Sequence, residues 1–255
     1  MGLKDNILNG TPLIGSFLGI ASPPLAEMLG NAGYDFIVLD TEHGAFNPGS
    51  TEDCLRAASA AGIPGIVRTS ALDAALIQSA LDLGATGVQI PQIETAAQAH
   101  AAVHSSNFAP AGDRGYGSAT RAAAYGFLSR TEVKAKAQKE VVVNIQIESK
   151  TGVDNLPAIL AVEGIDIIFI GTSDLSMSYG YDSPNDPAMM PLVENVISAI
   201  TKAGKIPGMH LSDWSKIEYL QQLGVRFFTV SAAMVIKDAF IKQVESFLRA
   251  VKRTP

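Results

Sequence analysis

Short apolar runs alternate along the chain with longer stretches in which apolar and polar residues recur at helical spacing. Two of the runs, "KEVVVNIQI" and "GIDIIFIG", are almost entirely apolar. Such runs are typical of parallel strands that are covered on both faces. The pattern predicts eight β-strands, near residues 13–19, 36–40, 65–68, 87–90, 141–147, 166–170, 206–209 and 226–230.

The intervening stretches predict eight helices, near residues 23–32, 52–61, 72–82, 94–104, 149–160, 188–203, 212–222 and 236–251. Glycine often precedes a strand by a few residues, as in "AGYD" and "LGATG", which is usual where a loop leaves a helix. Eight alternating pairs predict an α/β protein, a (β/α)8 TIM barrel that forms a single domain over residues 1–255. A doubly wound open sheet is the alternative, but it usually needs fewer strands, and no glycine-rich phosphate fingerprint follows the first strand.

One connection is longer than this scheme needs. The segment from about 105 to 130 is rich in glycine, alanine and serine, and it carries Arg114 and Arg121. A connection of this length is usually functional or mobile.

Composition narrows the class of partner. The net charge is −6 and the pI about 5.2, so the chain has no basic footprint for nucleic acid or an anionic membrane. Cys54 is the only cysteine, which excludes an intrachain disulfide and suits a reducing cytoplasm. No apolar run approaches the ~20 residues of a membrane span, and "MGLKDNILNG" lacks the apolar region of a signal peptide. We therefore expect a cytoplasmic protein.

Polar residues collect where the predicted strands end. In a (β/α)8 barrel these ends form one rim, and active sites lie there. Scattered structural polar groups would have no reason to prefer one end of every strand, so the pattern predicts an enzyme. The residues concerned are Asp40, Glu42, His43, Arg68, Gln89, Asn144, Gln146, Glu148, Gly171, Ser173, Asp174 and His210.

Glu148 and Asp174 are the most specific candidates for a cation site. They follow consecutive strands, so the barrel should place them side by side, and two crowded carboxylates either share a proton or hold a cation. Mg²⁺ is typically held by one or two carboxylates together with water and substrate oxygens, and Mn²⁺ or Co²⁺ would also fit. The alternative is a pair of solvated or arginine-paired rim carboxylates.

Arg68 and His43 each allow more than one interpretation. Arg68 either balances the acidic rim or stabilises an oxyanion that forms during a reaction. His43 is a metal ligand, a histidine satisfied in the core, or a general base, since imidazole titrates near neutral pH.

The remaining histidines and lysines offer weaker candidates. His100 and His104 lie one helical turn apart with no carboxylate obviously placed beside them, so we interpret them as surface residues. His210 is either a rim residue or a partner that orients another site residue. Lys150 is the nearest candidate for a Schiff base, but it lies past the end of its strand, in the first turn of a predicted helix.

Several blocks of the sequence resemble the HpcH/HpaI aldolases, which are metal-dependent class II pyruvate aldolases. The resemblance covers residues 10–235, and its motifs are specific in combination although each is weak alone. The blocks are "DFIVLDTEHGAFN", "VRTS", "LDLGATGVQIPQIETAAQA", "RGYGSATRA", "VVVNIQIES" and "GIDIIFIGTSDLSMSYG".

The resemblance implies roles for individual residues. By resemblance, His43 transfers protons, Arg68 stabilises the transition state, and Asp82 raises the basicity of His43. The divalent cation is implied at Glu148 and Asp174, and the 2-oxoacid at Gln146, Ser173 and Asp174.

The resemblance also implies a homohexamer of tight dimers in which the last helix is swapped to a neighbour. Asp82 precedes the fourth strand, away from the rim, so our hypothesis is that it reaches the site of an adjacent subunit. Two positions depart from the family pattern: Thr172, where we expect proline, and Phe17, where some members have tryptophan. Both bear on the shape of the pocket and leave the acceptor aldehyde open.

The implied reaction is a reversible aldol cleavage of 4-hydroxy-2-oxoacids to pyruvate, or hydroxypyruvate, and an aldehyde. His43 would move the C3 proton, directly or through a bound water, with Asp40 and Glu42 orienting and tuning it. The alternatives are a related barrel lyase acting on acyl-CoA esters, such as malyl- or citramalyl-CoA, and a 2-oxoacid-binding barrel without turnover.

Overall fold

Eight parallel strands close into a barrel in the computed structural model, which describes residues 2–253. Each strand pairs with its neighbours in chain order, and β8 returns to β1 with Leu13 opposite Phe227. The strands are β1 (Leu13–Leu18), β2 (Phe36–Asp40), β3 (Gly65–Arg68), β4 (Gly87–Ile90), β5 (Val142–Ile147), β6 (Ile167–Ile170), β7 (Ile206–His210) and β8 (Phe227–Ser231). The ring of strands is closed and has no open edge, unlike a doubly wound sheet. The predicted (β/α)8 barrel is therefore confirmed. The predicted single domain over 1–255 includes residues 1, 254 and 255, which lie outside the described residues.

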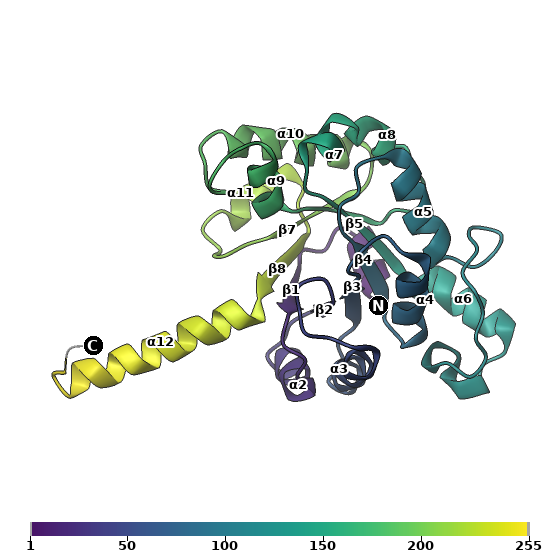
Figure 1. Cartoon of the computed structure of the whole chain (residues 1–255), viewed down its shortest axis with the longest axis horizontal. Helices are drawn as coiled ribbons and strands as arrows, with labels where there is room; N and C mark the ends of the chain where they lie inside the picture. Colours follow the sequence, from purple (N-terminus) through teal and green to yellow (C-terminus); the bar gives the residue numbers. More distant parts are fainter. Residues whose placement is uncertain (1, 254–255) are drawn as a thin grey trace.

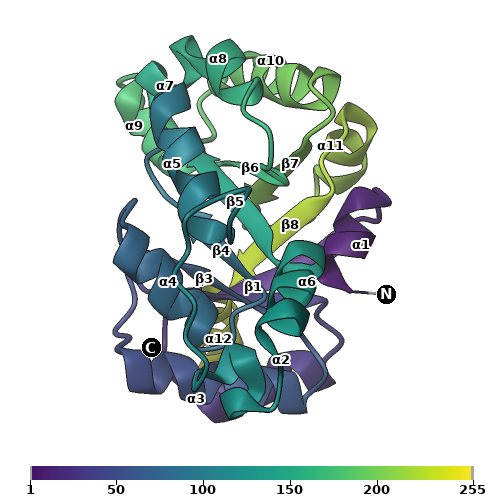
Figure 2. The same ribbon diagram turned by 90° about the vertical axis from the view of Figure 1, so that its right-hand side faces the viewer.

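Helices surround this barrel (Figures 1 and 2). All eight predicted helical regions contain helix. The helices are α1 (Leu3–Leu8), α2 (Pro23–Asn31), α3 (Pro48–Ala60), α4 (Ala74–Asp82), α5 (Ala96–Ser106), α6 (Arg130–Glu140), α7 (Lys150–Asp154), α8 (Leu156–Leu160), α9 (Thr172–Ser178), α10 (Met189–Lys202), α11 (Ile217–Leu223) and α12 (Ala232–Ala250), with a 3₁₀ segment η1 (Arg121–Gly126).

Two corrections concern helices. The single helix predicted over 149–160 is wrong: α7 and α8 meet at Asn155, because Pro157 cannot donate a backbone hydrogen bond and its ring would clash with the carbonyl four residues earlier. The sequence pattern also missed α6, which follows the long 105–130 segment. In that helix only Val133 is buried, so it has no apolar stripe to detect, and its start is instead marked by a capping box at Ser129.

The barrel interior is filled by side chains from alternating strand positions. A cluster made of Leu13, Phe36, Val38, Ile66, Val142, Ile167, Phe169 and Phe227 packs inside the ring. Leu3 and Ile7 of α1 join this cluster. The neighbours of Leu3 and Ile7 in this cluster include the first residues of several strands. Helix α1 therefore covers the N-terminal end of the barrel and leaves the C-terminal rim open.

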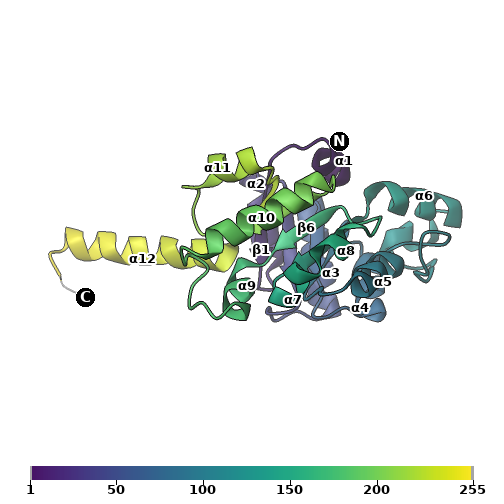
Figure 3. The ribbon, with the colours of Figure 1, turned by 90° about the horizontal axis from the view of Figure 1, so that it is seen from above.

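The last helix does not follow the barrel. Helix α12 extends away from the other elements and carries the C-terminal end of the chain (Figures 1 and 3). Large apolar side chains along it are exposed: Met234, Val235, Phe240, Ile241, Val244 and Phe247. In the part of the chain that the structure describes, none of the helices combines the length and the apolar composition of a membrane span.

Candidate active site

Arg68 and Asp40 form the rigid centre of the C-terminal rim. They end neighbouring strands in register, and the guanidinium donates from Nε to Asp40 Oδ1 at 2.9 Å and from Nη2 to Oδ2 at 2.7 Å. Burial alone would raise the pKa of Asp40, but the hydrogen bonds and charge of Arg68, with two backbone N–H donors, hold that pKa below its usual value. Asp40 is therefore the ionised partner that fixes the arginine.

The same aspartate orders the turn that carries His43. Asp40 Oδ1 accepts the backbone N–H groups of Glu42 at 3.2 Å and of His43 at 3.1 Å. Glu42 Oε2 lies 3.0 Å from Arg68 Nη1 and 3.8 Å from His43 Nε2. Burial raises the pKa of Glu42 despite the nearby charge of Arg68. The imidazole of His43 is 68% exposed, so it faces the open side of the rim, where a substrate would arrive.

Glu148 ends a directed row of buried amides. Asn144 donates to Gln89 at 3.0 Å, Gln89 donates to Gln146 at 2.6 Å, and Gln146 donates to Glu148 Oε2. The other carboxylate oxygen of Glu148 accepts the backbone N–H of Gln92 at 2.8 Å. Gln92 has a φ of 56°, an uncommon conformation for a residue other than glycine. The protein thus fixes both oxygens of one buried carboxylate.

Ser173 and Asp174 lie in the first turn of α9, directly after β6, and both are exposed. Gly171 makes their approach to Glu148 possible, because a Cβ there would lie 2.6 Å from Glu148 Oε2. Burial, together with repulsion from Asp174 and Glu42, raises the pKa of Glu148. The rim therefore carries an excess of negative charge that a cation would relieve.

These residues fit a two-carboxylate cation site and not a richer one. Within residues 2–253 no group of three or more His, Cys, Asp or Glu side chains is arranged to hold a metal ion. A divalent cation at Glu148 and Asp174 would thus take its remaining oxygens from water and substrate, as Mg²⁺ commonly does.

Asp82 does not lie at this rim. It ends α4, and its Oδ1 accepts a 2.8 Å hydrogen bond from Arg114, whose guanidinium also stacks on Phe108 at 4.6 Å. Helices of the barrel run back from the C-terminal rim, so the end of α4 lies near the start of β4. Within one chain, Asp82 and His43 therefore belong to opposite ends of the barrel.

The lesser candidates are placed as follows. Lys150 is exposed at the start of α7 and pairs with Asp154, away from the barrel interior. His100 and His104 stack on each other with ring centroids 5.5 Å apart. One expectation was wrong: a carboxylate does lie beside them, since Asp113 from the long loop is 3.2 Å from His104. Loop residues far along the chain cannot be placed from helical spacing.

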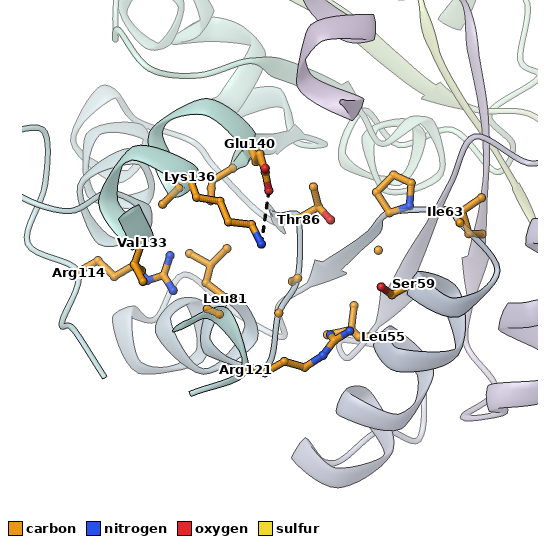
Figure 4. A pocket seen from close by; sticks show the side chains of 18 residues that line it. Leu55, Ser59, Ile63, Leu81, Thr86, Arg114, Arg121, Val133, Lys136 and Glu140 are labelled. Carbon is orange, nitrogen blue, oxygen red and sulfur yellow. Dashed lines mark ion pairs between the residues drawn. The ribbon is translucent and has the colours of Figure 1, made fainter. Parts of the chain in front are cut away.

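A cavity of about 420 Å³ lies at the other end of the barrel, where α3 and α4 end and α6 passes. Figure 4 shows Arg121, Lys136 and Glu140 on its walls. Arg121 donates to the carbonyl of Leu83, just past α4, at 3.1 Å. A cation at a helix C-terminus satisfies free carbonyl groups and the helix dipole. Arg121 therefore has a structural partner in this cavity, whereas the carboxylates and the exposed His43 described above lie at the rim.

Three rim residues contribute more than the sequence indicated. Phe17 lies under Arg68, with the guanidinium carbon 4.9 Å from the ring centroid. Gln92 supplies the N–H to Glu148, and His210 packs edge-on against Phe17. Strand ends mark the rim, but cross-barrel contacts between side chains leave no local signal.

A closed (β/α)8 barrel whose rim combines paired carboxylates, a fixed arginine and an exposed histidine defines an enzyme suited to acid–base chemistry on a small anion. The chain belongs to the HpcH/HpaI aldolase/citrate lyase family, whose model matches residues 13–234. The predicted resemblance is confirmed.

Named relatives are aldolases. The chain is 36% identical over 230 residues to the hydroxypyruvate/pyruvate aldolase of Roseobacter denitrificans, covering 89% of each protein. It is 35% identical over 229 residues to the 4-hydroxy-2-oxo-heptane-1,7-dioate aldolase of Shigella sonnei, covering 89% of this chain and 87% of that protein. These names bear out the predicted class, a carbon–carbon lyase, and do not favour the acyl-CoA or non-catalytic alternatives.

A solved structure agrees with the fold. The HpcH/HpaI aldolase/citrate lyase family protein from Burkholderia cenocepacia is 33% identical, with a TM-score of 0.89 over 97% of this chain and 98% of that chain.

Proposed function

We propose that this protein is a divalent-metal-dependent class II aldolase that reversibly cleaves 4-hydroxy-2-oxoacids to pyruvate, or hydroxypyruvate, and an aldehyde. The observation that carries the proposal is the fixed Asp40–Arg68 pair and the buried Glu148 on one rim of a barrel of this family. We place the enzyme in the cytoplasm and assign it one barrel domain over residues 1–255.

The 2-oxoacid is held on the side of the rim that carries Gln146 and Glu148. Glu148 and Asp174 would hold Mg²⁺, Mn²⁺ or Co²⁺, which when bound supplies Lewis-acid polarisation of the ketone. Gln146 and the first turn of α9 at Ser173 position the oxoacid. The amide row keeps the Gln146 side chain in one orientation, so little ordering is needed when substrate binds.

Proton transfer falls to His43. In the direction of aldol addition its imidazole removes a proton from C3 of the bound pyruvate, and in cleavage it returns a proton to C3. Asp40 holds the backbone of its turn, and Glu42 lies near Nε2. Arg68 faces the oxygen on which negative charge then develops. Three of its five N–H donors are engaged by Asp40 and Glu42, which leaves two for substrate.

The functional unit in this proposal is a homohexamer with swapped last helices. Helix α12 points away from the barrel instead of lying along the outer face of β8 and β1 (Figures 1 and 3). A hollow of about 180 Å³ remains there, lined by Ile14, Trp214, Ile217, Phe228 and their neighbours. The exposed apolar side chains of α12 match this surface in character, which supports the exchange of α12 between copies.

Asp82 would then act on the His43 of another subunit. Its distance from the rim of its own barrel supports that assignment. Mixing inactive Asp82→Asn and His43→Ala chains tests it, because reassembled hexamers should regain activity at sites that pair an intact histidine with an intact aspartate. Mixtures that stay inactive after verified subunit exchange would contradict it.

The function itself is tested by aldehyde release from 4-hydroxy-2-oxoheptanedioate, with a reductase reporting the aldehyde. We expect release with Mg²⁺ or Mn²⁺, loss after EDTA treatment, and recovery when metal is restored. Borohydride with substrate should trap no lysine adduct. Undiminished activity after metal removal, or a trapped Lys150 adduct, would refute the proposal.

A further inference from the structure

His210 is a titratable side chain of the rim that the reaction above does not use. It ends β7, and Gly208, two residues earlier, faces Phe169 and Phe227 inside the barrel. Because side chains two apart in a strand share a face, His210 also points inward, in the layer that leads to the rim. It is partly buried.

Its surroundings come from three other strands. Phe17 of β1 presents its ring at a centroid distance of 6.0 Å and an angle of 60°. Thr229 of β8 places Oγ1 3.3 Å from His210 Nδ1. Burial, and then the charge of Arg68 on β3, lower the pKa of His210. No carboxylate among the described residues pairs with it. The imidazole is therefore neutral at physiological pH.

We assign the tautomer of His210 from its contact with Thr229. Thr229 is fully buried, and its hydroxyl has no other side-chain partner in residues 2–253. A buried hydroxyl needs an acceptor for its proton, and Nδ1 is within reach. A neutral imidazole that accepts at Nδ1 carries its proton on Nε2. Nε2 is thus a donor for which no protein acceptor is present among the described residues.

A role in packing alone does not explain this arrangement. The neighbouring positions of this side of the barrel are filled by Phe17, Phe169 and Phe227, and an aromatic or aliphatic side chain would complete that cluster without an unmatched donor. His210 lies at the rim end of β7, and only β6 separates it from β5, whose Gln146 ends the amide row at Glu148.

We propose that His210 Nε2–H donates a hydrogen bond to an oxygen substituent of the acceptor aldehyde, so that the enzyme prefers short aldehydes bearing a hydroxyl or carboxylate over alkyl aldehydes. This inference rests on the proposed aldolase function. An oxoacid held on the β5–β6 side leaves the β7–β1 side for the acceptor, where Phe17 and His210 are the side chains that meet it.

The test compares glycolaldehyde with propanal, which differ by a hydroxyl in place of a methyl group, as acceptors for pyruvate. The donor half of the reaction is followed separately, as exchange of the pyruvate methyl protons in D₂O. We expect His210→Phe, which keeps the ring and removes the donor, to lower the glycolaldehyde-to-propanal ratio of kcat/KM by about tenfold. Exchange should stay within about twofold of wild type.

Three further variants sharpen the result. His210→Gln, whose amide also donates, should keep most of the ratio. Thr229→Val, which frees the tautomer, should lower it by about threefold. His100→Leu, an exposed histidine on α5, should change nothing.

The outcomes are distinguishable. An unchanged ratio in His210→Phe overturns the assignment of His210, and so does a fall in methyl exchange equal to the fall in aldol addition. A wild-type protein that shows no methyl exchange with metal overturns the aldolase function instead. If His210→Phe does not fold, the glycolaldehyde-to-propanal ratio of kcat/KM in Thr229→Val tests the assignment of His210 instead.

Discussion

The two sides of the barrel interior differ in chemistry. From β2 to β5 the inward side chains near the rim are Asp40, Arg68, Gln89, Gln146 and Glu148, joined by hydrogen bonds or ion pairs. From β6 round to β1 three of the inward side chains are aromatic: Phe169, Phe17 and, at the start of β8, Phe227. Burial of the polar side chains on the first side costs free energy unless each of them has hydrogen-bond or ion-pair partners. The second stabilises through packing and leaves a water-poor wall beside the charged groups.

The two sides of the barrel interior therefore have different tasks: one carries the charged groups, and the other keeps water away from them. Preorganised charges act more strongly beside a low-dielectric wall than in water. We therefore expect changes on the polar side to affect turnover most and changes on the aromatic side to affect mainly stability.

The largest effect should come from Glu148→Gln. The neutral amide can still accept from Gln92 N–H, but the charge that holds a cation is lost. We expect kcat for aldol cleavage to fall about 1,000-fold, equal to roughly 4 kcal/mol, and Mn²⁺ binding measured by EPR to weaken. Glu140→Gln, at the opposite end of the barrel, is the matched control. A variant with full activity after EDTA treatment would show that the polar side binds no metal.

Arg68→Ala should come next. Removal of a donor aimed at developing charge typically costs about 100-fold in kcat, and Arg68→Lys should recover little because an ammonium cannot form the bidentate pair with Asp40. Steady-state kinetics with pyruvate and an aldehyde separate kcat from KM. If only KM changed, Arg68 would serve substrate affinity and not the transition state.

Asp40→Asn should reduce both stability and its pH dependence. Because the folded pKa of Asp40 lies below its usual 3.8, its ion pair stabilises the fold above that pH, and the contribution is lost as pH falls through the lowered pKa. The variant should be less stable by about 3 kcal/mol at pH 7, and the gap to wild type should narrow below pH 3.8.

Urea unfolding at pH 7 and pH 3.5 measures both quantities for Asp40→Asn. The exposed Asp53→Asn is the control. A gap that does not change with pH would mean that the carboxylate is not held ionised by Arg68.

The smallest effect should come from Phe227→Leu on the aromatic side. Phe227 stacks on Phe36 with centroids 4.1 Å apart, so we expect a loss of about 1.5 kcal/mol in the free energy of unfolding. Turnover per folded enzyme should be unchanged. A fall in kcat as large as that of Arg68→Ala would remove the distinction between the two sides.

Sequence patterns predicted the strands closely, because buried parallel strands have a strong apolar signal. The predicted 36–40, 65–68 and 87–90 coincide with β2, β3 and β4. Helices such as α6 and α9 were missed, since one lacks an apolar face and the other spans only seven residues. Predicted rim residues such as Asp40 and Arg68 do meet, yet their bidentate pairing could not be read from strand ends.

By itself the sequence determined the strand order, the single rim of polar residues and the family, because each depends on local apolar periodicity or on motif blocks along the chain. Only the tertiary structure decided that Asp40 holds Arg68, that amides point in one direction toward Glu148, and that His210 faces Phe17 and Thr229. Apart from the hydrogen bond between Gln146 and Glu148, those contacts join residues 19 to 193 positions apart. Their geometry comes from closure of the barrel, which no local pattern encodes.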